Sequence, residues 1–420
     1  MSATVATVSG RVSLTRARVM GILFVLIGVA ILVSFAGVSG ASDSRFVLNE
    51  ARGNAIRLPD LVVPTRGTAM FLAAVCAFLG AIQLTRGFGT KVTLVLAVVV
   101  VLFVFAFLTW AARDRSLNLL GMLQSTVLRS VPITFGALSG VLCERSGVIN
   151  IGIEGMLLTA AFTGAIVGSA ASSLLAGLVA GALIGGLLGA LLAVLSIRYR
   201  VDQIVAGTVI NILALGLTSF LGSAILARFQ DLNNPGRFQN VALPFLSRIP
   251  LLGPMFFKQN IFVYLLIALV VLIHVGLFHT RWGLRVRAVG EHPRAADTVG
   301  IRVLFTRYRN VVLGGMVAGI GGAYFTLGSV GRFNEGMTAG RGFIGLAAMI
   351  FGRWTPIGAL GAGLVFGFAD SLRVKLSILN VPIPSEFLAM APYLVTILVV
   401  AGVVGRARPP AADGKPYVKE

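Results

Sequence analysis

The chain has 420 residues, of which 57% are hydrophobic and only 12% are charged, and its mean hydropathy is +0.93. Because soluble domains average about 25% charged residues, this composition excludes an ordinary soluble protein and indicates a chain that lies mostly in lipid. The formal net charge is +20, but the basic residues lie in loops and at the ends of apolar runs. We therefore attribute them to membrane orientation and to anionic headgroups, and we expect no nucleic-acid partner.

Three apolar runs come first, at residues 19–37, 67–85 and 92–112. The first follows a basic tail, as in a signal peptide, but it is long enough to cross a bilayer and no small-x-small cleavage site ends it. We therefore expect an uncleaved first span. All three runs are rich in Leu, Val and Phe, as expected of helices that face lipid.

Eight further runs are long enough to span the membrane, namely 119–143, 152–170, 173–197, 203–227, 260–279, 310–328, 356–372 and 386–404. A shorter run at 342–352 has about eleven residues, whereas roughly 20 are needed to cross the hydrocarbon. We expect it to be re-entrant or half of a broken helix. The sequence therefore predicts an all-α polytopic membrane protein of about twelve segments, with both termini in the cytoplasm.

Glycines recur every four residues in three of these runs, at Gly177, Gly181, Gly185 and Gly189 in one, at Gly315 and Gly319 in the second, and at Gly363 and Gly367 in the third. Such small-xxx-small faces let helices approach closely in lipid, where no hydrophobic effect drives their association. We therefore expect an N-terminal tail with peripheral spans (1–118), a tightly packed core (119–404) and a C-terminal cytoplasmic tail (405–420).

The segment 143–156 reads C-E-R-S-G-V-I-N-I-G-I-E-G-M and sets polar residues between two apolar runs. Irregular backbone and charge at membrane depth survive only inside protein or beside a water-filled cavity. Two interpretations stay open for Glu154: it faces the solute pathway, or it stabilises a helix start. For Asn211 an interhelical hydrogen bond is favoured over a solute contact, and the ring of Phe343 suits a flat solute. The candidate pathway residues are Arg129, Asn150, Glu154, Asn211 and Phe343.

The loop 280–309 carries seven arginines against two acidic residues. Loops this basic stay on the cytoplasmic side. Pro293 can start a short helix within it and Gly300 can end that helix, which suggests contact with another protein; the alternative is a solvated loop that only orients the chain. The candidate contact residues are Gly290, Glu291, Pro293, Arg294, Ala295, Ala296 and Gly300.

The sequence carries no signature of an enzyme. It has no G-x-x-x-x-G-K-[ST] loop to hold nucleotide phosphates, and no nucleophile has a base nearby. Cys76 and Cys143 lie inside apolar runs and the three histidines do not cluster, so we expect neither a disulfide framework nor a metal site.

Three blocks resemble one known family. The run E-R-S-G-V-I-N-I-G-I-E-G (144–155) is similar to the signature of permease subunits of nucleoside and simple-sugar ABC importers, in the superfamily of the ribose and branched-chain amino acid permeases. Residues 283–301 resemble the cytoplasmic loop with which this family presents a coupling helix to its ATPase, and 340–359 resemble a third block. The loop departs from other ABC permeases at Arg294, where they usually have Glu.

The resemblance implies a plasma-membrane permease subunit for nucleosides or related small polar solutes. It implies that a cytoplasmic ABC ATPase uses ATP and Mg²⁺, that this chain binds no cofactor, and that a second permease chain and an extracytoplasmic solute-binding protein complete the importer. Simple sugars and branched-chain amino acids stay open as solutes. A secondary transporter is disfavoured because the core shows no cluster of ion-coupling carboxylates.

Overall fold

The computed structural model describes residues 3–40, 42–49, 58–379, 387, 390 and 408–419. Ten of its helices are long and apolar enough to cross a membrane, namely Ala17–Ala36, Thr65–Thr85, Gly89–Ala111, Leu119–Glu144, Ile153–Ala170, Leu174–Arg198, Gln203–Leu226, Ile261–His279, Val303–Val330 and Pro356–Ile378. They confirm the predicted all-α polytopic fold. The run predicted at 386–404 falls almost wholly outside the described residues.

The chain forms two compact units, and the first comprises Met1–Met122 with Arg373–Leu388. Its helical elements are α1 (Ala3–Ile31), η1 (Leu32–Ala36), α2 (Thr65–Thr85), η2 (Gly89–Lys91) and α3 (Val92–Ala111). A small sheet of β2 (Leu61–Pro64), β1 (Asp43–Val47) and β3 (Ser116–Asn118), in that order, joins them and was not predicted. The Oγ of Ser44 lies 2.6 Å from the carbonyl oxygen of Thr109 and 2.7 Å from the Oγ1 of Thr65, which fixes the sheet to the helix ends.

The second unit comprises Leu123–Leu372 with Ala389–Glu420. Its first spans are α4 (Leu119–Glu144), α5 (Ile153–Ala170), α6 (Leu174–Ala193) with η3 (Val194–Arg198), and α7 (Gln203–Leu221) with η4 (Gly222–Leu226). A connection follows with η5 (Gln230–Asn233), η6 (Leu246–Arg248), α8 (Leu252–Phe256) and the antiparallel pair β4 (Val241–Ala242) and β5 (Lys258–Gln259). The remaining helices are α9 (Ile261–His279), α10 (Arg281–Glu291), α11 (Pro293–Thr298), α12 (Val303–Ala323) with η7 (Tyr324–Val330), α13 (Arg341–Phe351) and α14 (Pro356–Ile378).

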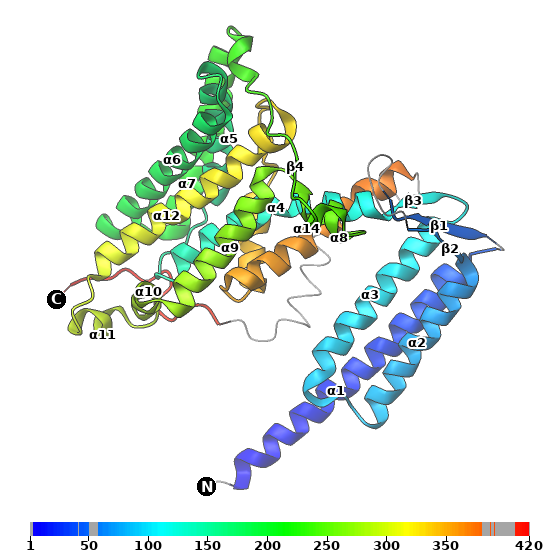
Figure 1. Ribbon diagram of the computed structural model, residues 1–420. Helices are drawn as coiled ribbons and strands as arrows, with labels where there is room; N and C mark the ends of the chain where they lie inside the picture. Colours follow the sequence, from blue (N-terminus) through cyan, green and yellow to red (C-terminus); the bar gives the residue numbers. More distant parts are fainter. Residues whose placement is uncertain are drawn as a thin grey trace. The chain divides into compact units, whose positions relative to one another are not determined.

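The glycine stripe of α6 packs directly against α12, and the two helices lie side by side (Figure 1). A Cβ placed on Gly185 would lie 2.7 Å from the Cα of Gly319, and one on Gly189 would lie 2.8 Å from the carbonyl oxygen of Val311. Real Cβ atoms do not approach so closely, so only glycine permits this backbone contact. The predicted close approach of glycine faces is confirmed. Of the ten candidate spans, α4 has the largest buried share and forms the centre of this unit.

Candidate solute pathway and coupling site

The predicted break in the membrane segment is present between α4 and α5. The helix α4 ends at Glu144, Gly147 takes a positive φ of 87°, and α5 begins at Ile153. The side chain of Gln203 accepts a hydrogen bond from the backbone N–H of Ile149 at 2.7 Å. The unwound strip is therefore shorter than the predicted Asn150 to Gly155, because Glu154 and Gly155 already belong to the first turn of α5.

Two asparagines lie at the break: Asn150 belongs to it, and Asn211 contacts it from α7. Asn150 is fully buried, and its Nδ2 donates to the Oγ of Ser139 at 3.3 Å. Asn211 on α7 accepts from the N–H of Gly155 at 2.8 Å and donates to the carbonyl oxygen of Ile151 at 2.9 Å. Asn211 thus makes the interhelical hydrogen bonds that the sequence analysis favoured. The amide of Asn211 therefore satisfies two backbone groups that the break leaves open at membrane depth.

Glu154 connects the break to the short helix α13. Its Oε1 accepts from the N–H of Gly340 at 2.8 Å and its Oε2 accepts from the N–H of Gly342 at 2.6 Å. A carboxylate in this position satisfies the open amides at a helix start and lies at the favourable end of the helix dipole. The helix start that Glu154 stabilises through hydrogen bonds is that of α13, which follows it by more than 180 residues in the chain.

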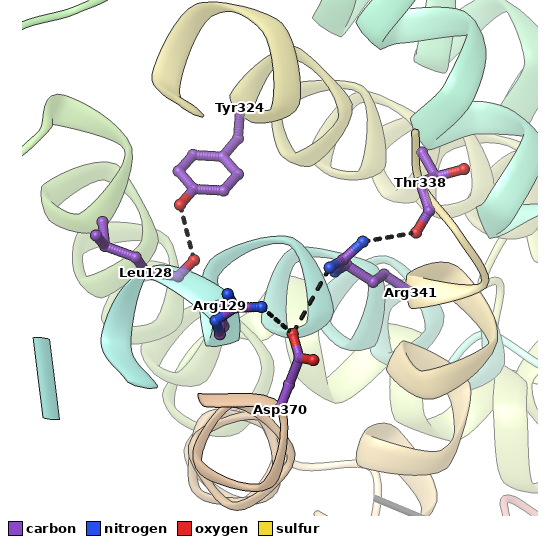
Figure 2. A network of polar contacts seen from close by, with 6 residues as sticks. All are labelled: Leu128, Arg129, Tyr324, Thr338, Arg341 and Asp370. Atoms are coloured by element: carbon purple, nitrogen blue, oxygen red, sulfur yellow. Dashed lines mark hydrogen bonds and ion pairs between the residues drawn. The ribbon is translucent and has the colours of Figure 1, made fainter. Parts of the chain in front are cut away.

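A cluster of ionic side chains lies around Asp370 on α14 (Figure 2). Arg129 of α4 donates from Nη1 to the Oδ2 of Asp370 at 2.5 Å, and the Nη2 of Arg341 lies 3.6 Å from the same oxygen. Arg341 also donates to the carbonyl oxygen of Thr338 at 3.3 Å. The three charged side chains are 17–28% exposed, so each is only partly buried and keeps some contact with solvent.

The structure brings the predicted pathway residues together only in part. Asn150, Glu154 and Asn211 surround the break, whereas Arg129 belongs to the cluster around Asp370. Phe343 lies on α13, is 48% exposed and makes no ring contact with any residue that the structure describes. The first turn of α13 links the two groups, because it holds both the amides that Glu154 binds and the guanidinium of Arg341.

The sequence analysis missed Asp370 and Arg341 as members of this site. Each was visible as a charged residue in or beside an apolar run, and such residues commonly pair with one another inside a membrane protein. Their partners were not visible, because 241 residues separate Arg129 from Asp370 in the chain.

The basic loop contains more helix than predicted. The short helix α11 (Pro293–Thr298) is confirmed, and Gly300 ends that turn with a positive φ of 81°. In addition, α10 continues from α9 after Thr280, whose Oγ1 accepts from the N–H of Gly283 at 3.2 Å. The prediction took the whole segment between the two spans as a loop and placed only the short helix after Pro293 in it. Val286, Val289 and Gly290 have the spacing of one buried helix face.

Only some of the predicted contact residues are accessible. Glu291, Arg294, Ala295 and Gly300 are exposed, and Pro293 is half-buried. Ala296 is 3% exposed and packs against Val289, Val303 and Tyr417 of this chain, so the prediction that it reaches a partner is wrong. Gly290 is also buried, since a Cβ there would collide with the carbonyl oxygen of Arg145.

The C-terminal tail packs against the coupling region. The N–H of Ala412 donates to the carbonyl oxygen of Gly290 at 2.9 Å, and the N–H of Ala411 donates to Glu291 at 3.1 Å. Arg307 of α12, which is 2% exposed, donates to the carbonyl oxygen of Lys415 at 2.9 Å. The tail thus connects α10 with α12, and nothing in its sequence had indicated this.

Asp413 makes the docking of this tail sensitive to pH. Burial raises the pKa of Asp413 to about 6, although a hydrogen bond with Glu144 and the charge of Arg307 both act to lower it. A carboxyl group whose pKa rises on docking favours docking when protonated. The docked tail is therefore most stable below the pKa of the free carboxyl group, and it loses stability as the pH rises through about 6.

We expect hydrogen exchange in residues 408–419 to be faster at pH 7.5 than at pH 5, after correction for the intrinsic rate. Asp413→Asn should remove most of this difference and keep the tail protected at pH 7.5, because the amide stays neutral. Lys415→Gln, which leaves the backbone acceptor for Arg307 in place, is the control and should keep the wild-type difference. An unchanged pH response in Asp413→Asn would contradict the assignment.

Comparison with known proteins agrees with this architecture. The family described as branched-chain amino acid transport system / permease component matches residues 122–401. The chain belongs to this permease family. The match starts next to the boundary at which the second compact unit begins, at Leu123.

Individual relatives show which branch of this permease family the chain resembles. The permease is 43% identical to the guanosine ABC transporter permease protein NupQ of Bacillus subtilis, covering 71% of this chain and 96% of the relative. It is 40% identical to the nucleoside ABC transporter permease protein NupC of Lactococcus lactis, covering 72% and 99%. A putative glucose ABC transporter permease protein, TsgC13 of Haloferax volcanii, is 31% identical, and the match covers 68% of this chain and 92% of the relative. No solved structure gives a significant match. This chain is therefore a multi-pass permease subunit of an ABC importer.

Proposed function

We propose that this permease translocates nucleosides across the plasma membrane. The observation that carries the proposal is its identity of 43% and 40% to a guanosine and a nucleoside permease, over almost their whole length. In the proposed importer a cytoplasmic ATPase binds ATP and Mg²⁺, a second permease chain completes the pathway, and an extracytoplasmic protein delivers the solute. Both termini and the segment 280–309 lie in the cytoplasm, and residues 1–118 form a peripheral part that braces the assembly.

The cluster around Asp370 supports a polar solute in this proposal. The guanidinium groups of Arg129 and Arg341 are donors and the carboxylate of Asp370 is an acceptor, which are the groups that hydroxyls of a ribose and the polar edge of a base require. The exposed ring of Phe343, two residues from Arg341, can stack on a base.

We propose that the other three candidate pathway residues shape the pathway and do not contact the solute. Glu154 uses both carboxylate oxygens on α13, and Asn211 uses its amide on the residues at the break. Asn150 donates to Ser139 of α4. We assign these three residues to holding the pathway open. Glu154 binds the first turn of α13, and Arg341 is part of that turn. A displacement of this turn would therefore move Arg341 relative to Asp370 and break the hydrogen bonds of Glu154 at the same time.

Uptake measurements separate nucleosides from sugars. In a host without its own nucleoside importers, we expect the importer, expressed with its partner subunits, to take up labelled guanosine. Excess adenosine or uridine should compete, and glucose or leucine should not. Glucose uptake that nucleosides leave unchanged would favour the second candidate function, for which the Haloferax relative is the supporting observation.

A substitution at Ala295, the exposed one of the two adjacent alanines in α11, tests the proposed ATPase contact. Ala295→Glu places a charge on the exposed face of α11, and burying an unpaired charge in an interface is strongly unfavourable. We expect the variant to insert normally but to lose transport at least about tenfold, with weaker co-purification of the ATPase. Val418→Glu is the control, since it adds the same charge at an exposed side chain outside α11. Normal co-purification and uptake in Ala295→Glu would refute this contact.

A further inference from the structure

A basic cavity of about 790 Å³ lies between α10 and the start of α12. Its lining contains Arg281 and Arg285 of α10, Arg302 before α12 and Arg309 within it. No acidic residue is among the lining residues, and in the described part of the chain none of the four arginines has an ion-pair partner. We call this site the arginine cavity.

The spacing of the arginines explains why they converge. Arg281 and Arg285 are four residues apart and lie on one face of α10. Arg302 precedes the first residue of α12, and Arg309 lies about two turns further along that helix. The two pairs meet across the cavity. Gathering four like charges without counter-charge is unfavourable, and an anion in the cavity relieves the repulsion.

The arginine cavity lies at the ends of two membrane spans. The span α9 ends at His279, two residues before Arg281, and the candidate span Val303–Val330 begins one residue after Arg302. Leu284 and Phe305 also line the cavity, and each is 61% exposed. This combination fits the membrane interface, where arginines contact the headgroups and exposed apolar side chains contact the acyl chains.

Trp282 supplies a second, independent observation. It lines the cavity, and its ring lies 5.9 Å from the guanidinium carbon of Arg309. The indole N–H is buried and has no acceptor among the residues that the structure describes. We therefore do not assign the indole as a ligand for the anion, but a tryptophan stacked beside an arginine at the end of a span is typical of the membrane–water interface.

We infer that the arginine cavity binds the phosphate headgroup of an anionic phospholipid from the cytoplasmic leaflet. The charge selects the phosphate, and the apolar residues at the rim accommodate the acyl chains. Val299, Gly300 and Ile301 also line the cavity and directly follow α11. A bound headgroup therefore steadies the end of the helix that we propose contacts the ATPase. The inference uses the proposed cytoplasmic orientation, and it is independent of which solute is transported.

Native mass spectrometry of the importer, purified with its partner subunits, tests the inference. Phosphatidylglycerol and phosphatidylcholine serve as probes, and we expect retention of the first and not of the second. Arg285→Gln with Arg309→Gln should weaken phosphatidylglycerol binding about 25-fold, at about fivefold for each arginine near the membrane surface. Arg285→Gln alone, at an exposed position, should weaken it about fivefold.

The matched control replaces Arg198 and Arg200 with glutamine. Arg198 is the last residue of η3 and Arg200 follows it by two residues. Both lie outside the cavity and on the same proposed side of the membrane, so the charge lost is equal. The control should bind phosphatidylglycerol as the wild type does. Equal loss in the control, or equal retention of the two lipids by the wild type, would overturn the inference.

Two further outcomes identify other ligands. Binding of inorganic phosphate without preference for phosphatidylglycerol would make this a site for a free anion. Loss of ATPase assembly in the double variant with unchanged lipid binding would make it a protein contact. Either result overturns the lipid assignment. Intact lipid binding in an importer that takes up no nucleoside would refute only the proposed function.

Discussion

Replacing Asp370 with asparagine should abolish transport and destabilise the permease. The change leaves Arg129 and Arg341 without the carboxylate oxygen that both approach, and the local charge rises from +1 to +2. Removing one partner of a poorly solvated ion pair costs about 3 kcal/mol or more. We expect a lower melting temperature in detergent and uptake reduced to background.

A charge-compensated variant separates stability from transport. Arg129→Gln combined with Asp370→Asn restores the local charge of +1, because Arg341 alone remains charged. We expect this double variant to recover most of the melting temperature but not the uptake, since the charged donor of Arg129 and the charged acceptor of Asp370 are replaced by neutral amides that bind a polar solute more weakly. Full uptake in the double variant would show that the pair is structural and does not contact the solute.

Replacing Gly185 with leucine should have a comparable effect on stability. Its Cβ would lie 2.7 Å from the Cα and 2.8 Å from the backbone nitrogen of Gly319, and backbone cannot move aside as a flexible side chain can. The helices α6 and α12 would have to separate along their common face. We expect a loss of about 3 kcal/mol or more, at or beyond the upper end of ordinary overpacking, measured as loss of the monodisperse peak in size-exclusion chromatography.

Gly216→Leu is the matched control for this prediction. Gly216 lies within α7, and a Cβ placed on it meets no atom within 4 Å. The same substitution there should leave the elution profile close to that of the wild type. Equal damage in both variants would point to a general cost of leucine for glycine instead of the packing of α6 on α12.

The class of the protein and most of its spans follow directly from the amino-acid sequence. Ten long apolar runs became helices because hydrocarbon offers the backbone no hydrogen-bond partner other than the helix itself. The glycine stripe, the break after Glu144 and the short helix that starts at Pro293 were also predicted correctly. Each depends on residues close together in the chain, since helical period, turn chemistry and span length are local properties.

The pairing of the polar groups depends on how the helices pack in three dimensions. Asp370 pairs with Arg129 across 241 residues, and Glu154 binds amides more than 180 residues away. Ala295 and Ala296 differ by one position, yet one is exposed and the other is buried beneath Tyr417 of the C-terminal tail. Composition and period predict that a polar residue in lipid needs a partner, but they do not name it, because the partner depends on how the helices pack.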